Sequence, residues 1–149
     1  MKRNDIHHES IGDVPWHEQH QCWGAKIDIV GCPTPLTILA SESGDPPIEF
    51  ISTLVDTIRN DEDRYRRIAA DELLHVYNDD WRHYTDDGFE ISPETFMQRL
   101  SLKMLQIEHL TQSQSWAAVI TYDPANMFTE HDVAVYVSTD LSSLGVVPD

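Results

Sequence analysis

The chain has 149 residues, of which 26 are Asp or Glu and 10 are Lys or Arg, so its formal net charge at pH 7 is −16. A field this negative repels nucleic acid and anionic membranes, and it attracts basic proteins. The length fits one domain, the 40% of apolar residues argues against disorder, and no apolar run is long enough for a membrane span or a secretory signal.

The first elements along the chain are a polar segment and a β-hairpin. Residues 1–21 are polar with scattered histidines, and we expect an irregular segment that is partly docked on the fold through Trp16. Residues 22–30 alternate between apolar and polar side chains, which indicates a half-buried strand. Residues 31–35 contain a glycine and two prolines and predict a turn, so residues 36–40 form the returning strand.

Two amphipathic helices follow the hairpin. Asp45 is placed to cap a helix over residues 46–59, with Pro46 at its first position. A second helix is expected over residues 61–78, where apolar residues recur at helical spacing. Acids on its exposed side precede bases by four positions, which predicts ion pairs between Glu62 and Arg66 and between Asp63 and Arg67.

A loop, a short helix and three strands complete the predicted elements. Residues 79–91 form a polar loop anchored by Trp81, Tyr84 and Phe89. Ser92 caps a short third helix that begins at Pro93. Residues 141–149 are expected to be a loose tail or a short addition at the edge of the sheet. Alternating side chains predict three consecutive strands in an antiparallel meander, over residues 102–109, 115–122 and 132–139.

These elements predict an α+β fold with an N-terminal β-hairpin, two amphipathic helices plus a short third helix, and a C-terminal three-stranded antiparallel meander. The helices pack on one sheet. We place a single domain at residues 22–140, between the polar segment 1–21 and the tail 141–149. The cysteines, Cys22 and Cys32, do not face each other across the hairpin, so we expect free thiols and a cytoplasmic protein.

The acidic excess is greatest in the helical region. Residues 45–94 hold 14 acidic and 5 basic residues, a net charge of −9. Part of this charge is paired along the second helix, whereas the loop that follows is rich in unpaired carboxylates. An aromatic side chain ringed by acids is typical of a protein-interface hot spot. The candidate partner-binding residues are therefore Asp79, Asp80, Trp81, Asp86, Asp87 and Glu90.

Metal and catalytic chemistry is indicated only by incomplete patterns. His17, His20 and Cys22 have H-x-x-H-x-C spacing, but a structural zinc site needs four ligands. The acidic loop lacks the alternation of a calcium loop, although it leaves opportunistic binding of a divalent ion open. His131 and Asp123 lie near each other in sequence without a recognisable nucleophile. We therefore predict no catalytic, cofactor-binding or metal-binding residue, and no cofactor.

Three motifs resemble a known bacterial family. Residues 69–81 carry L-L-x-x-Y-N-x-x-W on a predicted helix, and residues 91–100 carry a capped [ST]-x-E-x-F-x-x-R-L. Tyr122-Asp123, then Met127-Phe128 with His131, complete the pattern. Together they are similar to a domain-of-unknown-function family of small bacterial proteins, over roughly residues 22–140.

The resemblance implies a single α+β domain and brings no established activity. It also implies roles for four residues of the first motif. Leu73, Leu74 and Tyr77 form a helix face that packs on the sheet. Asn78 ends the helix, since Asn tolerates the left-handed conformation that such a position requires.

The sequence favours binding over catalysis. The leading hypothesis is an acidic protein-binding domain, a cytoplasmic immunity or antitoxin-type inhibitor of a basic toxin such as a nuclease. One alternative is a structural or regulatory domain that oligomerises, for example as a homodimer through an exposed sheet face. A further alternative is a metal-dependent hydrolase that uses the acidic loop or the region of His131. The expected partner is a basic protein, and not nucleic acid or membrane.

Overall fold

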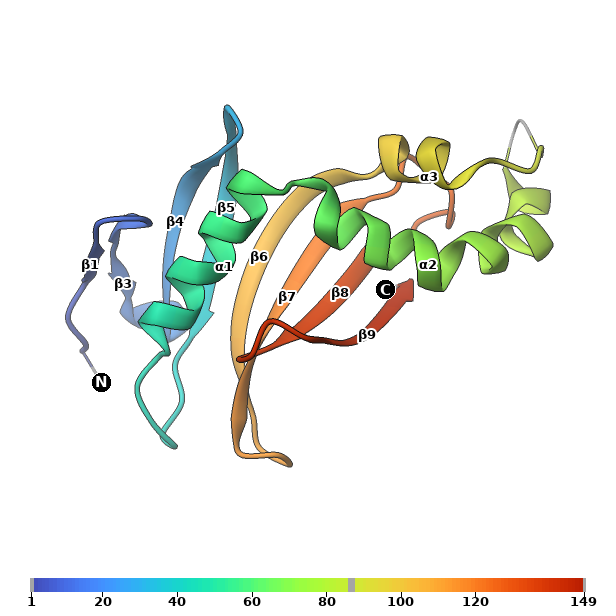
Figure 1. The fold of residues 1–149 in the computed structure, drawn as a ribbon. Helices are drawn as coiled ribbons and strands as arrows, with labels where there is room; N and C mark the ends of the chain where they lie inside the picture. Colours follow the sequence, from blue (N-terminus) through green and yellow to red (C-terminus); the bar gives the residue numbers. More distant parts are fainter. Residues whose placement is uncertain (1, 86–87, 149) are drawn as a thin grey trace.

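The computed structural model describes residues 2–85 and 88–148, and Figure 1 shows the path of the chain. The α-helices of this part are α1 (Ile48–Asn60), α2 (Asp63–Asp79) and α3 (Pro93–Arg99), and its 3₁₀ turns are η1 (Glu18–His20) and η2 (Trp81–Tyr84). The strands are β1 (Ile6–His8), β2 (Gly12–Val14), β3 (Trp16–His17), β4 (Cys22–Ile29), β5 (Cys32–Leu39), β6 (Ser101–Leu110), β7 (Ser115–Asp123), β8 (Val133–Ser138) and β9 (Ser143–Pro148).

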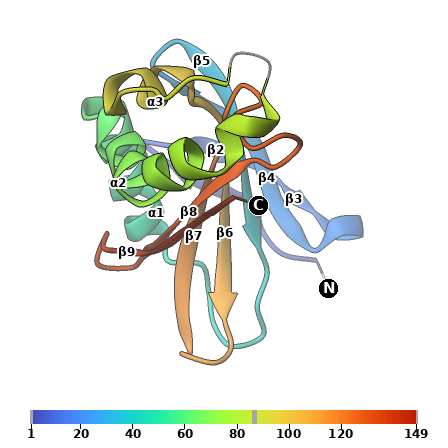
Figure 2. The same ribbon diagram turned by 90° about the vertical axis from the view of Figure 1, so that its right-hand side faces the viewer.

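The main sheet has seven strands in the order β3-β4-β5-β6-β7-β8-β9. Neighbouring strands are antiparallel except β5 and β6, which are parallel because the chain passes between them through the three helices. The helices all lie on one face, and no helix of the described residues covers the other (Figure 1 and Figure 2). The predicted α+β fold is confirmed, with the hairpin, the helices and a C-terminal meander on one sheet.

The core lies between the helix layer and the sheet. On α1, Ile51, Leu54 and Val55 are fully buried at the helical spacing that the sequence predicts. On α2, Tyr65 and Tyr77 are fully buried as well. Burial of one such apolar side chain is worth about 1.5–3 kcal/mol, so this layer contact is the main stabilising feature. The opposing side chains of the sheet include Leu36, Ile38, Leu105, Ile107, Ile120, Val133, Val135 and Val137.

The hairpin β4–β5 turns earlier than the sequence predicts. Its turn is made by Val30 and Gly31, both with positive φ (51° and 76°), and β5 already begins at Cys32. The expected turn over 31–35 is therefore wrong. Two prolines are tolerated in this strand because β5 pairs with β6 only from Leu36 onward. Both prolines precede this pairing, so their missing N–H groups remove no hydrogen bond between β5 and β6.

The starts of the helices follow two different rules. Ser92 caps α3 as predicted, since its Oγ accepts a hydrogen bond from the backbone N–H of Thr95 at 3.2 Å. Asp45 does not cap α1: the helix begins at Ile48, after Pro47, which makes no side-chain cap. Pro47 at the cap position has no N–H group, so one of the N–H groups that a helix start leaves without an intrahelical partner is absent here.

The N-terminal segment is ordered, which corrects the expectation of an irregular segment at residues 1–21. β1 and β2 form a hairpin of their own, in which His7 pairs with Asp13. Ile11 and Val14 on this hairpin are buried in the main core. The sequence pattern did not reveal these strands because they are only three residues long and each contributes few apolar side chains.

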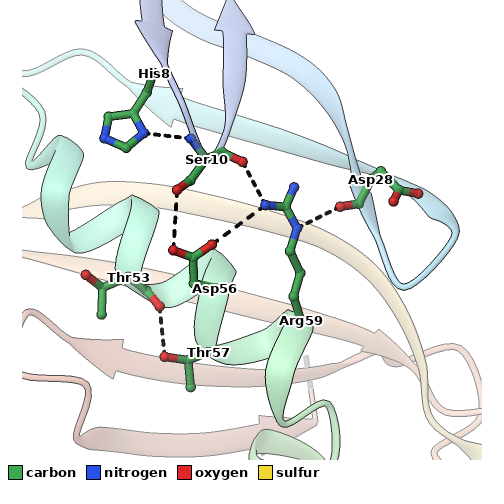
Figure 3. Close-up of polar contacts among 7 residues, drawn as sticks. All are labelled: His8, Ser10, Asp28, Thr53, Asp56, Thr57 and Arg59. Atoms are coloured by element: carbon green, nitrogen blue, oxygen red, sulfur yellow. Dashed lines mark hydrogen bonds and ion pairs between the residues drawn. The ribbon is translucent and has the colours of Figure 1, made fainter.

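Arg59, at the end of α1, joins three parts of the fold (Figure 3). Its Nε donates to the backbone oxygen of Asp28 on β4 at 3.0 Å, and its Nη1 donates to the backbone oxygen of Ser10 in the β1–β2 turn at 2.7 Å. Asp56 lies 3.8 Å from the guanidinium and also accepts from the Ser10 hydroxyl at 3.3 Å. One arginine thus ties the N-terminal hairpin and the main sheet to the helix layer.

The chain end is also part of the sheet. Residues 143–148 form β9, which pairs with β8, so the second of the two expectations for 141–149, an edge addition, is the one observed. The meander therefore continues into a fourth strand. Cys22 and Cys32 are free thiols, as predicted. Within the described ranges, every helix is too short or too polar to cross a bilayer.

Candidate functional site

The acidic residues predicted as a partner site lie where α2 ends and η2 follows. Asp79, Asp80 and Glu90 are exposed, so their carboxylates face solvent. Asp86 and Asp87 lie outside the described residues. This stretch is at the far end of the helix layer from the N-terminal hairpin (Figure 1). A partner could therefore reach it without contacting the rest of the sheet.

Trp81 is half-buried at the edge of the core. Its ring packs edge-on against Phe128 and against His131, with 5.6 Å between ring centroids in both pairs. Two other aromatic side chains of this stretch are open to solvent: Tyr84 is 70% exposed and Phe89 is 74% exposed. The aromatic groups available to a partner are thus Tyr84 and Phe89, and the expectation that these two side chains anchor the loop is wrong.

The loop that bears these residues is held from inside by Asn78. Its amide Nδ2 donates to the backbone oxygen of Ile91, and its Oδ1 accepts from the N–H of the same residue, both at 3.0 Å. Arg82 adds a hydrogen bond from Nη1 to the backbone oxygen of Gly88 at 2.8 Å. Asn78 lies inside α2, which continues to Asp79, so the expectation that it ends the helix is wrong. Its side chain forms hydrogen bonds with the loop backbone, and the residue does not end the helix.

A groove of about 530 Å³ lies between α2 and α3 on the same helix layer. This volume is within the usual range for ligand pockets. Four of its side chains are acidic and two are arginines, so it offers both signs of charge with an acidic excess. It is lined by Glu62, Asp63, Arg66, Arg67, Ala70, Asp71, Pro93, Glu94, Met97, Gln98 and Leu100.

Arg66 is the most enclosed charge of this groove. Its side chain is 20% exposed, and its Nη1 lies 3.7 Å from Asp63 Oδ1. The acidic partner of Arg66 is thus Asp63, three residues earlier, and not Glu62 as the sequence predicts. The guanidinium stands over the ring of Tyr122, 5.8 Å from the centroid. Burial raises the pKa of the Tyr122 phenol and that of Tyr65, so both remain neutral at physiological pH.

Two buried polar atoms of α2 lack a partner among the described residues. They are Nε of Arg66 and the hydroxyl of Tyr65, and both are buried. A buried donor without an acceptor usually costs about 1–3 kcal/mol. Arg66 lines the groove, whereas Tyr65 is not among its lining residues.

The histidine and carboxylate candidates elsewhere contact other groups of the fold. Asp123 accepts a hydrogen bond from the N–H of Ala125 at 2.9 Å in the turn after β7. Asp132 binds Lys103 Nζ at 2.6 Å, and this hydrogen bond and charge raise the pKa of Lys103. His131 packs on Trp81 instead of facing Asp123. His17 lies 3.2 Å from the backbone oxygen of Gly24.

The ligand spacing at His17, His20 and Cys22 does not form a metal centre. Across residues 2–85 and 88–148, no group of three or more His, Cys, Asp or Glu side chains is arranged to hold a metal ion. His109 packs against Trp116, with 5.3 Å between ring centroids. The structure thus brings together the acids and aromatics at the end of α2, and it leaves the histidines dispersed.

The geometry defines a small α+β protein in which a helix layer with an acidic surface covers one face of a mostly antiparallel sheet. The chain belongs to the family DUF2262, described as an uncharacterized protein conserved in bacteria, whose profile matches residues 8–143. The predicted resemblance to a bacterial family of unknown function is thereby confirmed. Comparison with curated proteins and with solved structures gave no significant match.

Proposed function

We propose that this protein is an acidic protein-binding domain whose helix layer binds a basic partner, as an immunity or antitoxin-type inhibitor binds a basic toxin such as a nuclease. The observation that carries the proposal is the pairing of exposed aromatics with exposed acids at the end of α2. Tyr84 and Phe89 supply apolar contact area beside Asp79, Asp80 and Glu90. Aromatic anchors surrounded by polar groups are typical of interface hot spots.

Electrostatics favours a basic partner over other classes. The net charge of −16 accelerates encounters with a positively charged surface, and the region of residues 45–94 alone carries −9. A basic nuclease has a positive cleft that normally holds phosphates. Carboxylates at comparable spacing compete for that cleft, which gives inhibition without any reaction chemistry.

Hydrogen bonds that hold Gly88 and Ile91 also support a binding role. Asn78 and Arg82 hold the backbone of Ile91 and Gly88 from inside the fold. A surface that is ordered before binding loses less conformational entropy when the complex forms. The groove between α2 and α3 extends the acidic surface through Asp71 and Glu94 and can accept a basic side chain of the partner.

A charge-reversal comparison tests this function. In the first variant, Asp79, Asp80 and Glu90 are each changed to Lys. In the matched control, three exposed acids at the other end of the molecule, Glu9, Glu42 and Asp45, are changed to Lys. Both variants change the net charge by the same amount. Wild type and variants are immobilised and used to capture proteins from a bacterial lysate, and each captured protein is then purified and titrated against all three.

The expected result is a basic protein that binds wild type and control, and that binds the α2-end variant at least about tenfold more weakly, since like charges at an interface are strongly unfavourable. If the partner is a nuclease, wild type inhibits its cleavage of nucleic acid at one-to-one stoichiometry. The proposal is overturned if no basic protein binds, or if the two charge-reversed variants bind equally well. A cytoplasmic location is part of the proposal, in keeping with the free thiols.

A further inference from the structure

The sheet has a second face, opposite the helix layer, that carries its own ordered rows of side chains. No helix of the described part of the chain covers it (Figure 2). The strand register aligns six residues into one row across the middle of this face. From β4 to β9 they are Gly24, Thr37, Gln106, Val119, Tyr136 and Gly145.

The apolar side chains of this face do not belong to the main core. Ala117 and Ala134 are fully buried, yet neither is part of the core cluster formed with the helices. They lie beside Val119 and Tyr136, which are half-buried. Small side chains of this face are thus fully buried, and larger ones in neighbouring positions remain partly open to solvent. Apolar side chains that stay partly open to solvent on one face are available for contact with a partner.

The charge of this face differs from that of the molecule. The chain carries −16, and the region that contains the helix layer carries −9. In the middle row every side chain is uncharged, and the rows on either side contribute one base, Lys26, and one acid, Glu108. The molecule therefore has an acidic helix layer on one side and a nearly neutral sheet face on the other.

We propose that this sheet face is the interface of a homodimer. Two copies of so acidic a chain repel each other in every approach that brings the helix layers together. Stacking the neutral faces places both helix layers on the outside, as far apart as the dimer allows. Under two-fold symmetry, Lys26 of one copy can face Glu108 of the second, so the charges on the face complement each other. A basic partner has no comparable attraction to this surface.

The size of the face is sufficient for a dimer. Six strands about 4.8 Å apart and three rows about 6.7 Å apart cover roughly 600 Å² a copy. The total of about 1,200 Å² is the lower limit for specific interfaces, which implies association that depends on concentration. Pairing through the sheet edges is less favourable, because β3 has two residues and β9 ends in Pro148.

Sedimentation velocity over a wide range of concentration tests the dimer, and its result does not depend on the proposed function. We expect wild type to reach twice its monomer mass of 17.1 kDa. Val119→Glu with Tyr136→Glu raises the dimer Kd at least about tenfold. The matched control, Val30→Glu with Tyr84→Glu, changes the same residue types at exposed positions off the face and leaves the Kd unchanged.

Three further variants keep the test decisive if Val119→Glu with Tyr136→Glu fails to fold. Gln106→Glu is close to isosteric and places like charges near the symmetry axis, so it also weakens the dimer. Lys26→Glu weakens it, and Lys26→Glu combined with Glu108→Lys restores it. Wild type that stays monomeric at every concentration overturns the proposal. A dimer that survives in folded Gln106→Glu and Lys26→Glu variants overturns it equally.

Discussion

The side chain of Asn78 on α2 holds the backbone of Ile91, thirteen residues further along the chain, through two hydrogen bonds of 3.0 Å. One bond uses the amide as donor and the other uses it as acceptor. This contact joins the last turn of α2 to the residue that precedes Ser92, the cap of α3. Tyr84 and Phe89 lie between these two bonded positions in the chain.

Replacing Asn78 destabilises the protein and frees the loop. Asn78→Ala leaves the N–H and C=O groups of Ile91 without a partner, and we expect a loss of about 2 kcal/mol in the free energy of unfolding. Asn78→Asp keeps the acceptor but loses the donor, so its loss is intermediate. Urea denaturation measures both. The neighbouring Asp79→Ala, at an exposed position, should stay within about 0.5 kcal/mol of wild type.

Arg59 cannot be replaced by lysine without loss. Its planar group donates in two directions, to Ser10 and to Asp28, whereas one ammonium group cannot reach both carbonyls from the same position. We expect Arg59→Lys and Arg59→Ala each to cost about 1–2 kcal/mol. Arg67→Ala removes the same charge from an exposed site and serves as the control in thermal unfolding. Equal melting temperatures for Arg59→Lys and wild type would contradict the dual contact.

A substitution in the turn of the hairpin β4–β5 should increase the stability of the protein. Val30 has a φ of 51°, which a β-branched residue adopts only with strain, and it is 59% exposed, so little burial is lost on replacement. Val30→Asn creates the Asn-Gly pair preferred in two-residue hairpin turns and should stabilise the protein by about 1 kcal/mol. Gly31→Ala, at a φ of 76°, should destabilise it by about 1–2 kcal/mol. Chemical denaturation of both variants gives the comparison.

The N-terminal hairpin is expected to respond to pH through His7. A hydrogen bond to Asp13 at 2.7 Å, and the charge of that carboxylate, raise the pKa of His7 above 6.5. A raised pKa means that the protonated form is stabilised on folding, so the contribution is complete below about pH 6.5 and is lost as the pH rises through the folded value. An NMR titration of the His7 ring should show the raised pKa, and Asp13→Asn should return it towards 6.5. An unchanged titration in Asp13→Asn would rule out this ion pair in solution.

Substitutions of Trp81 and Phe89 should separate effects on stability from effects on partner binding. Trp81 packs on Phe128 and His131, so Trp81→Ala should lower the free energy of unfolding by about 2 kcal/mol or more. Phe89 is 74% exposed, so Phe89→Ala should leave stability within about 0.5 kcal/mol. Under the proposed function, Phe89→Ala nevertheless weakens binding of the captured basic partner. Full binding by Phe89→Ala would exclude this side chain as an anchor.

Several elements were predictable because their signals are local. The apolar spacing of α1 and α2, the Ser92 cap of α3 and the alternation in β4 each depend on neighbours within a few residues, and the structure retains all of them. The three-residue strands β1 and β2 were missed because they are stabilised by distant contacts, such as those of Arg59, and not by a pattern of their own. The start of β5 was misplaced because its prolines indicate a turn unless the register with β6 is known.

The sequence by itself determined the fold class, the family resemblance and the concentration of acids between residues 45 and 94. It could do so because periodicity and charge are properties of the local chain. Only the tertiary structure decided that Trp81 is half-buried while Tyr84 and Phe89 are exposed, beside exposed acids at the end of α2. Which side chains meet solvent depends on how the helices pack on the sheet, and that packing joins residues far apart in the chain.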